Sequence, residues 1–231
     1  MTRAEKASRP PYSEMMFYRS SAGGAQEAPG TPLSKIKTIN SGIAANAAAA
    51  MRSGVNAIVP LAASATLQKR FARALSRWLG VCDIDKLPAC DHIPALTDFR
   101  ITSGQSFSDR FNVPVRITRV DATLTVCVHD FVPARDVSAP DGTVLLEVVV
   151  AVSGCFLNTG TSTGAQVMRI QVPYNESPVA SQSLAFAVSP DRGVLLVTGA
   201  WLQYYTATKN GIRRVDHPEY QPAGILQARY H

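Results

Sequence analysis

Hydrophobic residues recur at two different spacings along this chain, and the change of spacing separates a helical part from a β-part. Between residues 61 and 79, the apolar positions 67, 71, 74, 75 and 78 follow the 3.6-residue period of an amphipathic helix. Beyond residue 96, apolar and polar residues mostly alternate, as they do in half-buried strands. The sequence therefore predicts an extended arm over residues 1–32, a helical segment over 33–80, a connector over 81–95 and a β-sandwich domain over 96–231.

The helical segment has two halves of different character. From Thr38 to Val59 the residues are mostly small, and the alanines within 44–50 favour a helix because alanine has the highest helix propensity. Small side chains also allow another backbone to approach this half closely. Pro60 then either begins a second helix at its first turn or kinks a single long helix. Gly80 stands where the second half is expected to end.

The β-part is interpreted as about eight short strands with turns between them and no intervening helices. Asp121-Ala122, Pro140-Asp141-Gly142 and Asn210-Gly211 are typical turn sequences. Val144 to Ser153 is the most hydrophobic run and is expected to be a central strand, whereas the small polar residues 158–164 are expected to form a loop. The predicted fold is α+β: two helices, or one kinked helix, followed by an antiparallel sandwich. The expected strands cover residues 96–101, 113–120, 123–128, 144–153, 166–172, 183–188, 193–206, 212–215 and 224–230.

Positive charge is concentrated in the N-terminal third. Residues 1–80 contain eleven Lys or Arg and three Glu side chains, a net charge of +8, whereas residues 81–231 carry a net charge of −2. This asymmetry favours either a polyanion partner or head-to-tail attraction between copies of the chain. A basic face is expected opposite the apolar stripe of the second helix. It is either a solvated helix surface or a contact for phosphates or for an acidic patch on another subunit, and its residues are Lys69, Arg70, Arg73 and Arg77.

The arm over residues 1–32 contains one apolar island, Met15-Met16-Phe17-Tyr18. An arm so rich in proline and glycine does not fold alone in water, so we expect the island to dock, most simply on a neighbouring subunit. The basic start is followed by no apolar h-region, so we expect no signal peptide and synthesis in the cytoplasm. No run approaches 18 apolar residues, so membrane insertion is not expected. The sequence leaves open whether the protein ends up in a released particle or filament.

The cysteines offer little evidence for a metal site. Cys82 and Cys90 flank Asp83, Asp85 and His92, but the spacing fits no standard zinc module. Reduced thiols are the expected state in the cytoplasm, and a Cys82–Cys90 disulfide stays open. We therefore expect no metal and no cofactor.

Catalytic motifs are also missing. His129-Asp130 is interpreted as a pair of strand-end residues, because no nucleophile elbow accompanies it. Neither of the glycine-rich nucleotide-binding motifs occurs. Trp201, Tyr204 and Tyr205 could form an aromatic platform for a sugar or a base, but the favoured interpretation is core packing for alternate residues and ordinary exposed aromatics for the others. We therefore expect a protein that is not an enzyme and has no catalytic residues.

Several short phrases carry a resemblance to a known family. They are the amphipathic Leu67-Gln68-Lys69-Arg70-Phe71, the Val113-Pro114-Val115 strand start, Phe131 to Asp136 with Ala139 to Thr143, and a C-terminal hairpin from Leu195 to Tyr205 with Asn210-Gly211. Over residues 35–231 the chain resembles an uncharacterised bacterial domain family of unknown function, with a helical N-terminal part followed by a β-sandwich. This resemblance implies a fold but no activity, cofactor or site residues.

Three functional hypotheses follow. Charged residues make up only 17% of the chain and hydrophobic residues 46%, a composition that favours association. The first hypothesis is a structural protein that self-assembles into a filament, tube or shell through its arm and helices, with copies of itself as partners. The second is a coat protein whose basic N-terminal third binds a polyanion, namely the packaged nucleic acid. The third is a non-enzymatic module that binds a small ligand or a glycan in the sandwich loops.

Overall fold

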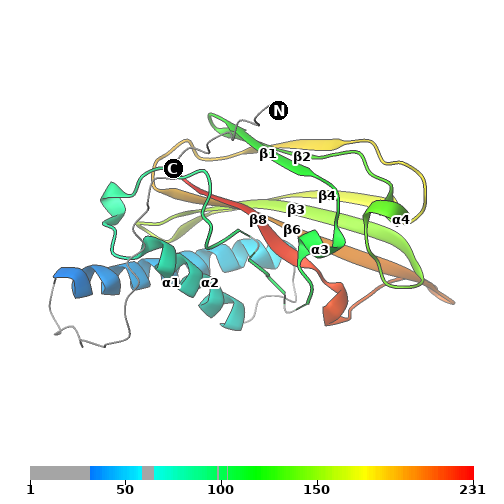
Figure 1. Ribbon diagram of the computed structural model, residues 1–231, viewed down its shortest axis with the longest axis horizontal. Helices are drawn as coiled ribbons and strands as arrows, with labels where there is room; N and C mark the ends of the chain where they lie inside the picture. The colour runs from blue at the N-terminus through cyan, green and yellow to red at the C-terminus, as the bar shows by residue number, and fades with distance from the viewer. Residues whose placement is uncertain (1–31, 59–64, 98, 103) are drawn as a thin grey trace, which may run out of the picture.

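The computed structural model describes residues 32–58, 65–97, 99–102 and 104–231. In this described part, two long helices precede eight strands, which confirms the predicted α+β fold (Figure 1). The sequence left open whether this part forms two helices or one kinked helix, and the structure has two. Pro60 lies outside the described residues. The elements are α1 (Pro32–Ile58), α2 (Ala65–Leu79), η1 (Ile84–Lys86), α3 (Phe107–Arg110), β1 (Val115–Val120), β2 (Thr123–Val128), α4 (Pro133–Asp136), β3 (Thr143–Phe156), β4 (Thr161–Pro173), β5 (Gln182–Ala187), β6 (Val194–Thr208), β7 (Gly211–Arg214), η2 (Pro218–Tyr220) and β8 (Ala223–Tyr230).

The elements form three layers, with the larger sheet in the middle (Figure 1). This sheet has the order β4-β3-β6, and the far edge of β6 pairs with β8 along its first half and with β7 along its second. The smaller sheet has the order β1-β2-β5, and all strand pairs are antiparallel. The two helices cover one face of the larger sheet and the smaller sheet covers the other. The larger sheet is therefore buried on both faces.

Strand β3 shows why its sequence is an almost continuous apolar run. Leu146, Val148 and Val150 point into the core between the two sheets. Val149 and Ala151, the alternate residues, point into the core beneath the helices. A strand covered on both faces needs apolar side chains at successive positions, so the predicted central strand is confirmed.

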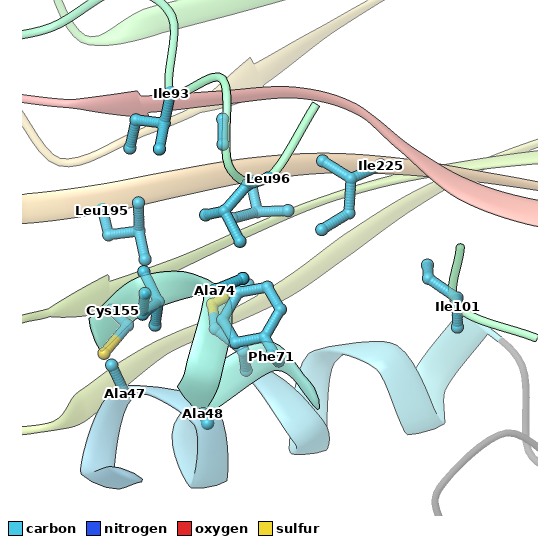
Figure 2. Close-up of a cluster of buried hydrophobic side chains, with 14 of the residues drawn as sticks. Ala47, Ala48, Phe71, Ala74, Ile93, Leu96, Ile101, Cys155, Leu195 and Ile225 are labelled. Carbon is cyan, nitrogen blue, oxygen red and sulfur yellow. The ribbon is translucent and has the colours of Figure 1, made fainter. Parts of the chain in front are cut away.

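The core beneath the helices depends on small side chains in α1. Ala44, Ala47 and Ala48 are buried on one face of this helix, which allows α1 to lie close to the sheet. Figure 2 shows Phe71 and Ala74 of α2 in the same buried cluster as the α1 alanines and the sheet residues Cys155, Leu195 and Ile225. The closest approach is at the β3–β4 turn, where a Cβ added to Gly160 would lie 2.8 Å from the Cβ of Asn46. The alanine run thus serves the close packing that the sequence suggested.

The strand predicted over residues 96–101 is wrong. This segment forms a turn and covers the outer edge of β8, to which Arg100 adds only an isolated bridge. The backbone N–H of Ile93 donates to the Ala228 carbonyl, and that of Ile101 donates to the Ala223 carbonyl. Leu96 and Ile101 are apolar because they fill the core beneath the helices, where Figure 2 shows them. An irregular segment that is buried thus contains as many apolar residues as a strand does.

The loop predicted over residues 158–164 is also partly wrong. The turn closes at Gly160, whose φ of +68° suits glycine, and β4 already begins at Thr161. Thr161 and Thr163 are small and polar because they lie on an exposed edge strand. The other predicted strands beyond residue 113 are confirmed, with their ends displaced by a few residues at most.

Candidate interaction surface

Helix α2 separates its apolar and basic residues as the sequence predicted. Its buried residues are Leu67, Phe71, Ala74, Leu75 and Leu79. Lys69, Arg73 and Arg77 are exposed and follow one another at four-residue spacing. This spacing places them along one side of the helix, with about 6 Å of rise between successive Cα atoms. They form a row of three cations, which we call the basic row.

Arg70 does not belong to the basic row, although the sequence placed it there. Its guanidinium group lies 5.0 Å from the centre of the Phe99 ring and donates a hydrogen bond of 2.8 Å to the Arg100 carbonyl oxygen. Its side chain is half-buried in this position. Arg70 therefore holds α2 against the segment that covers β8, and its guanidinium group is fixed by contacts within the fold.

The helical layer is exclusively basic. Helices α1 and α2 together contain seven Lys or Arg residues and no Asp or Glu. Within the described part of the chain, no carboxylate forms an ion pair with Lys69, Arg73 or Arg77. A row of like charges that has no ion pair among the described residues attracts anionic partners and accelerates their association.

The same layer exposes apolar side chains at one end. Leu33 and Ile39 lie near the start of α1 and are 49% and 59% exposed, and Val81, which follows α2, is 47% exposed. The Asn40 side chain joins the two helices here, so the three residues lie at the same end of the helix pair. We call them the apolar end. This surface was not predicted, although the sequence carries a signal for it in the three-residue spacing of apolar positions 33, 36 and 39 ahead of the alanine run.

The apolar island of the arm cannot be placed. Met15, Met16, Phe17 and Tyr18 lie outside the described residues. The arm connects directly to the start of α1, because the described part begins at Pro32. The apolar end is therefore the described surface nearest to the arm along the chain.

Two open clefts lie on the sandwich. A groove of about 620 Å³ separates the edge of β1 from β8, and its lining includes Arg119, Arg229 and His231. A second cleft of about 610 Å³ lies between η1 and the β5–β6 connection and also reaches His231. A third cavity, of only about 30 Å³ and almost entirely apolar, lies beneath α1 and α2. The first groove has the size of a small-molecule site.

These clefts show no arrangement of catalytic or metal-binding groups. In the residues that the structure describes, no three His, Cys, Asp or Glu side chains gather closely enough to hold a metal ion. All four cysteines are free, so Cys82 and Cys90 are not paired. Burial raises the pKa of the Cys155 thiol to about 11, which keeps it protonated and unreactive at neutral pH.

The aromatic residues at 201, 204 and 205 do not form a binding platform. Trp201 and Tyr204 are buried, one on each face of the larger sheet. Tyr205 is half-buried, and its hydroxyl group donates a hydrogen bond of 2.8 Å to Glu147. Burial and this bond raise the pKa of Tyr205. Core packing is therefore found on both faces of the strand and not at alternate residues alone, because both faces of the larger sheet are covered.

The two described long helices do not combine the length and apolarity that a membrane crossing requires. The basic row and the apolar end are the features of this surface that an interaction could use. Comparison with known proteins adds no further guide, because no protein-family model and no curated protein matches this sequence.

Proposed function

We propose that this protein is a structural protein that self-assembles through its helical layer and arm. The observation that carries the proposal is the helical layer itself, which is exclusively basic and ends in three exposed apolar side chains. Such a surface is poorly suited to water and well suited to a partner that is apolar at its centre and acidic around it.

The opposite end of the molecule supplies acidic groups. Figure 1 shows α4 at the far end of the long axis from the start of α1. The loops around α4 expose Asp130, Asp141 and Glu176, and none of these carboxylates forms an ion pair with a described residue. The β6–β7 hairpin also lies at this end, beyond the start of β3, and it is basic. The basic helical layer of another copy would therefore contact the α4 loops and not this hairpin.

A contact between two different ends of identical molecules is heterologous. The start of α1 in one copy would lie against the α4 loops of the next, with oppositely charged groups around an apolar centre. Repetition of such a contact produces a ring when the rotation closes and a filament when it does not. Burying the exposed half of Leu33 and of Ile39 would contribute about 1 kcal/mol each to every contact.

The test uses sedimentation velocity to compare a double serine variant with a single serine control. Leu33→Ser with Ile39→Ser should raise the dissociation constant of self-association by about thirtyfold, which corresponds to about 2 kcal/mol. Val120→Ser is the matched control, because Val120 is 70% exposed but lies on β1 of the smaller sheet, on the other side of the larger sheet from the helices. The proposal requires that the control assembles like the unchanged protein. A wild-type chain that stays monomeric at high concentration would refute it.

A second function is supported by the basic row. Three cations along one side of a helix, none of them ion-paired with a described residue, can each neutralise one phosphate of a nucleic-acid strand, as in a coat protein that packages nucleic acid. Replacing Lys69, Arg73 and Arg77 together by Gln should reduce the salt dependence of single-strand binding by about 2 logarithmic units per decade of salt. Fluorescence anisotropy with a labelled oligonucleotide measures this slope. An unchanged slope would exclude the basic row as the nucleic-acid contact.

A further inference from the structure

The groove between the two sheets contains an arginine that is buried without a close partner. Arg229 extends from β8 across the seam toward β1, and its side chain is only 12% exposed. Its Nη2 lies 3.5 Å from the Ile117 carbonyl oxygen, and its Nη1 lies 3.7 Å from Asp91 Oδ1. Both distances are long for a charged hydrogen bond, which normally measures about 2.7–2.9 Å.

The remaining nitrogen of this guanidinium group has no acceptor at all. Arg229 Nε is buried and makes no hydrogen bond within the described part of the chain. A guanidinium group carries five N–H donors, and burying a charge without compensation is costly. The fold therefore holds a desolvated cation at the floor of the groove, with most of its hydrogen-bonding capacity unused.

Two further polar side chains line the same groove. Arg119 on β1 is held in place because its Nε donates to the Asp121 carbonyl oxygen at 2.8 Å and its Nη2 donates to the Ser189 carbonyl oxygen at 3.2 Å. These neutral acceptors leave its positive charge uncompensated. His231 lines the groove as well, and its Nε2 atom is buried without a hydrogen-bond partner among the described residues.

The carboxylates of the groove compensate the charge at its floor only in part. Asp91 is 84% exposed, and its carboxylate stands in water at the rim. Asp121 also lines the groove, but it is exposed and contacts Arg119 through its backbone carbonyl, which carries no formal charge. Solvated carboxylates at a rim are screened, whereas the buried guanidinium is not. An anion at the floor of the groove would therefore be stabilised by the positive charge there.

We propose that the groove between β1 and β8 is a binding site for a small oxyanion, a phosphate or carboxylate group held by Arg229 and Arg119. Two oxygens on one atom match the parallel N–H groups of a guanidinium fork, which is the geometry that arginine recognises best. The groove volume of about 620 Å³ leaves room for the rest of a small ligand beyond this group. This site is separate from the helical layer and does not depend on self-assembly.

Thermal unfolding of the full chain tests the proposal with inorganic phosphate and with acetate as probes, against sodium chloride at equal ionic strength. Phosphate also stabilises proteins non-specifically, so the comparison with variants decides the result. The wild-type midpoint should rise saturably with one probe or both. Arg229→Met should abolish the saturable part, and Arg213→Met on β7 should leave it unchanged.

Arg229→Lys keeps the charge and most of the stem, so it covers the case in which Arg229→Met does not fold. Because lysine lacks the planar fork, the half-saturating concentration of the probe should increase at least tenfold. A saturable response to phosphate alone would identify a phosphate site, and a response to both probes would identify a general oxyanion site. The proposal is overturned if neither probe acts saturably on the wild type, or if Arg229→Lys responds like the wild type.

Discussion

The side chain of Asn40 donates a hydrogen bond of 3.1 Å to the carbonyl oxygen of Gly80, and a second bond of 2.9 Å to the Cys82 carbonyl oxygen. Asn40 is buried in α1, whereas Gly80 ends α2 with a φ of +53°. The last carbonyl groups of a helix lack partners within the helix. One amide group therefore completes the end of α2 and fixes the two helices relative to each other, and the apolar end depends on this junction.

Replacing Asn40 by Ala should destabilise the protein by about 1–3 kcal/mol, because two carbonyl groups lose their donor. Urea denaturation followed by circular dichroism measures the change. Asn46→Ala is the control, since Asn46 is exposed on the same helix and the substitution keeps its Cβ. It should change stability by less than about 0.5 kcal/mol. Equal losses in the two variants would mean that the Asn40 junction contributes nothing specific.

The two roles of the α2 arginines can be separated by single substitutions. Arg70→Gln removes the contact with Phe99 and the charged donor to the Arg100 carbonyl, and should cost about 1–2 kcal/mol of stability. Arg73→Gln should cost less than about 0.5 kcal/mol, because Arg73 is exposed and forms no ion pair in the described part. Urea midpoints give both values. The assignment of Arg70 to the fold would be contradicted if Arg73→Gln were the more damaging change.

Because α1 lies close to the β3–β4 turn, replacing Gly160 by Ala should destabilise the protein more than replacing Gly164 by Ala. Gly160→Ala combines an unfavourable φ of +68° with a Cβ contact of 2.8 Å to Asn46, and should destabilise by about 1–3 kcal/mol. Gly164→Ala has the same kind of backbone strain, with a φ of +85°, but no neighbour within 4 Å of the new Cβ. It should therefore cost less. Adding Asn46→Gly to Gly160→Ala should recover part of the loss, and failure to do so would argue against close contact here.

The four thiols should react at different rates with iodoacetamide in the native protein. Cys82 is exposed and should be modified first, Cys90 and Cys127 are half-buried, and Cys155 is buried with its pKa raised to about 11. Because only the thiolate reacts, Cys155 should stay unmodified at pH 8 until the protein unfolds. Intact-protein mass spectrometry counts the adducts. Four free thiols after denaturation without reductant are expected, and a count of two would reveal a disulfide.

The sequence allowed most of the β-architecture to be predicted because its signals are local. Alternation fixed the face of each residue in β1 and β2, and turn residues such as Asp121 and Asn210 marked the hairpins. Residues 96–101 were misassigned because their apolar side chains fill a core without forming a strand. Propensity and period cannot distinguish these two reasons for being apolar.

The functional surfaces were harder to predict because they depend on tertiary placement. The helical period correctly predicted that Lys69, Arg73 and Arg77 lie on one side of α2. It could not predict that Arg70 contacts Phe99, which is 29 positions away in sequence. Exposure of Leu33 and Ile39 depends on where α1 lies relative to the sheet. The groove brings Arg119 and Arg229 together from strands of two different sheets, and no local pattern in the sequence links them.

Negative-stain electron microscopy of the purified full-length protein decides whether it self-assembles, provided that the absorbance ratio at 260 and 280 nm is measured on the same sample. We expect ordered polymers with the low 260 nm absorbance of protein alone. Ordered particles rich in 260 nm absorbance would instead support the coat protein, with the basic row as the nucleic-acid contact. A monodisperse monomer at high concentration would contradict the account, because the apolar end would then have no partner among copies of the chain.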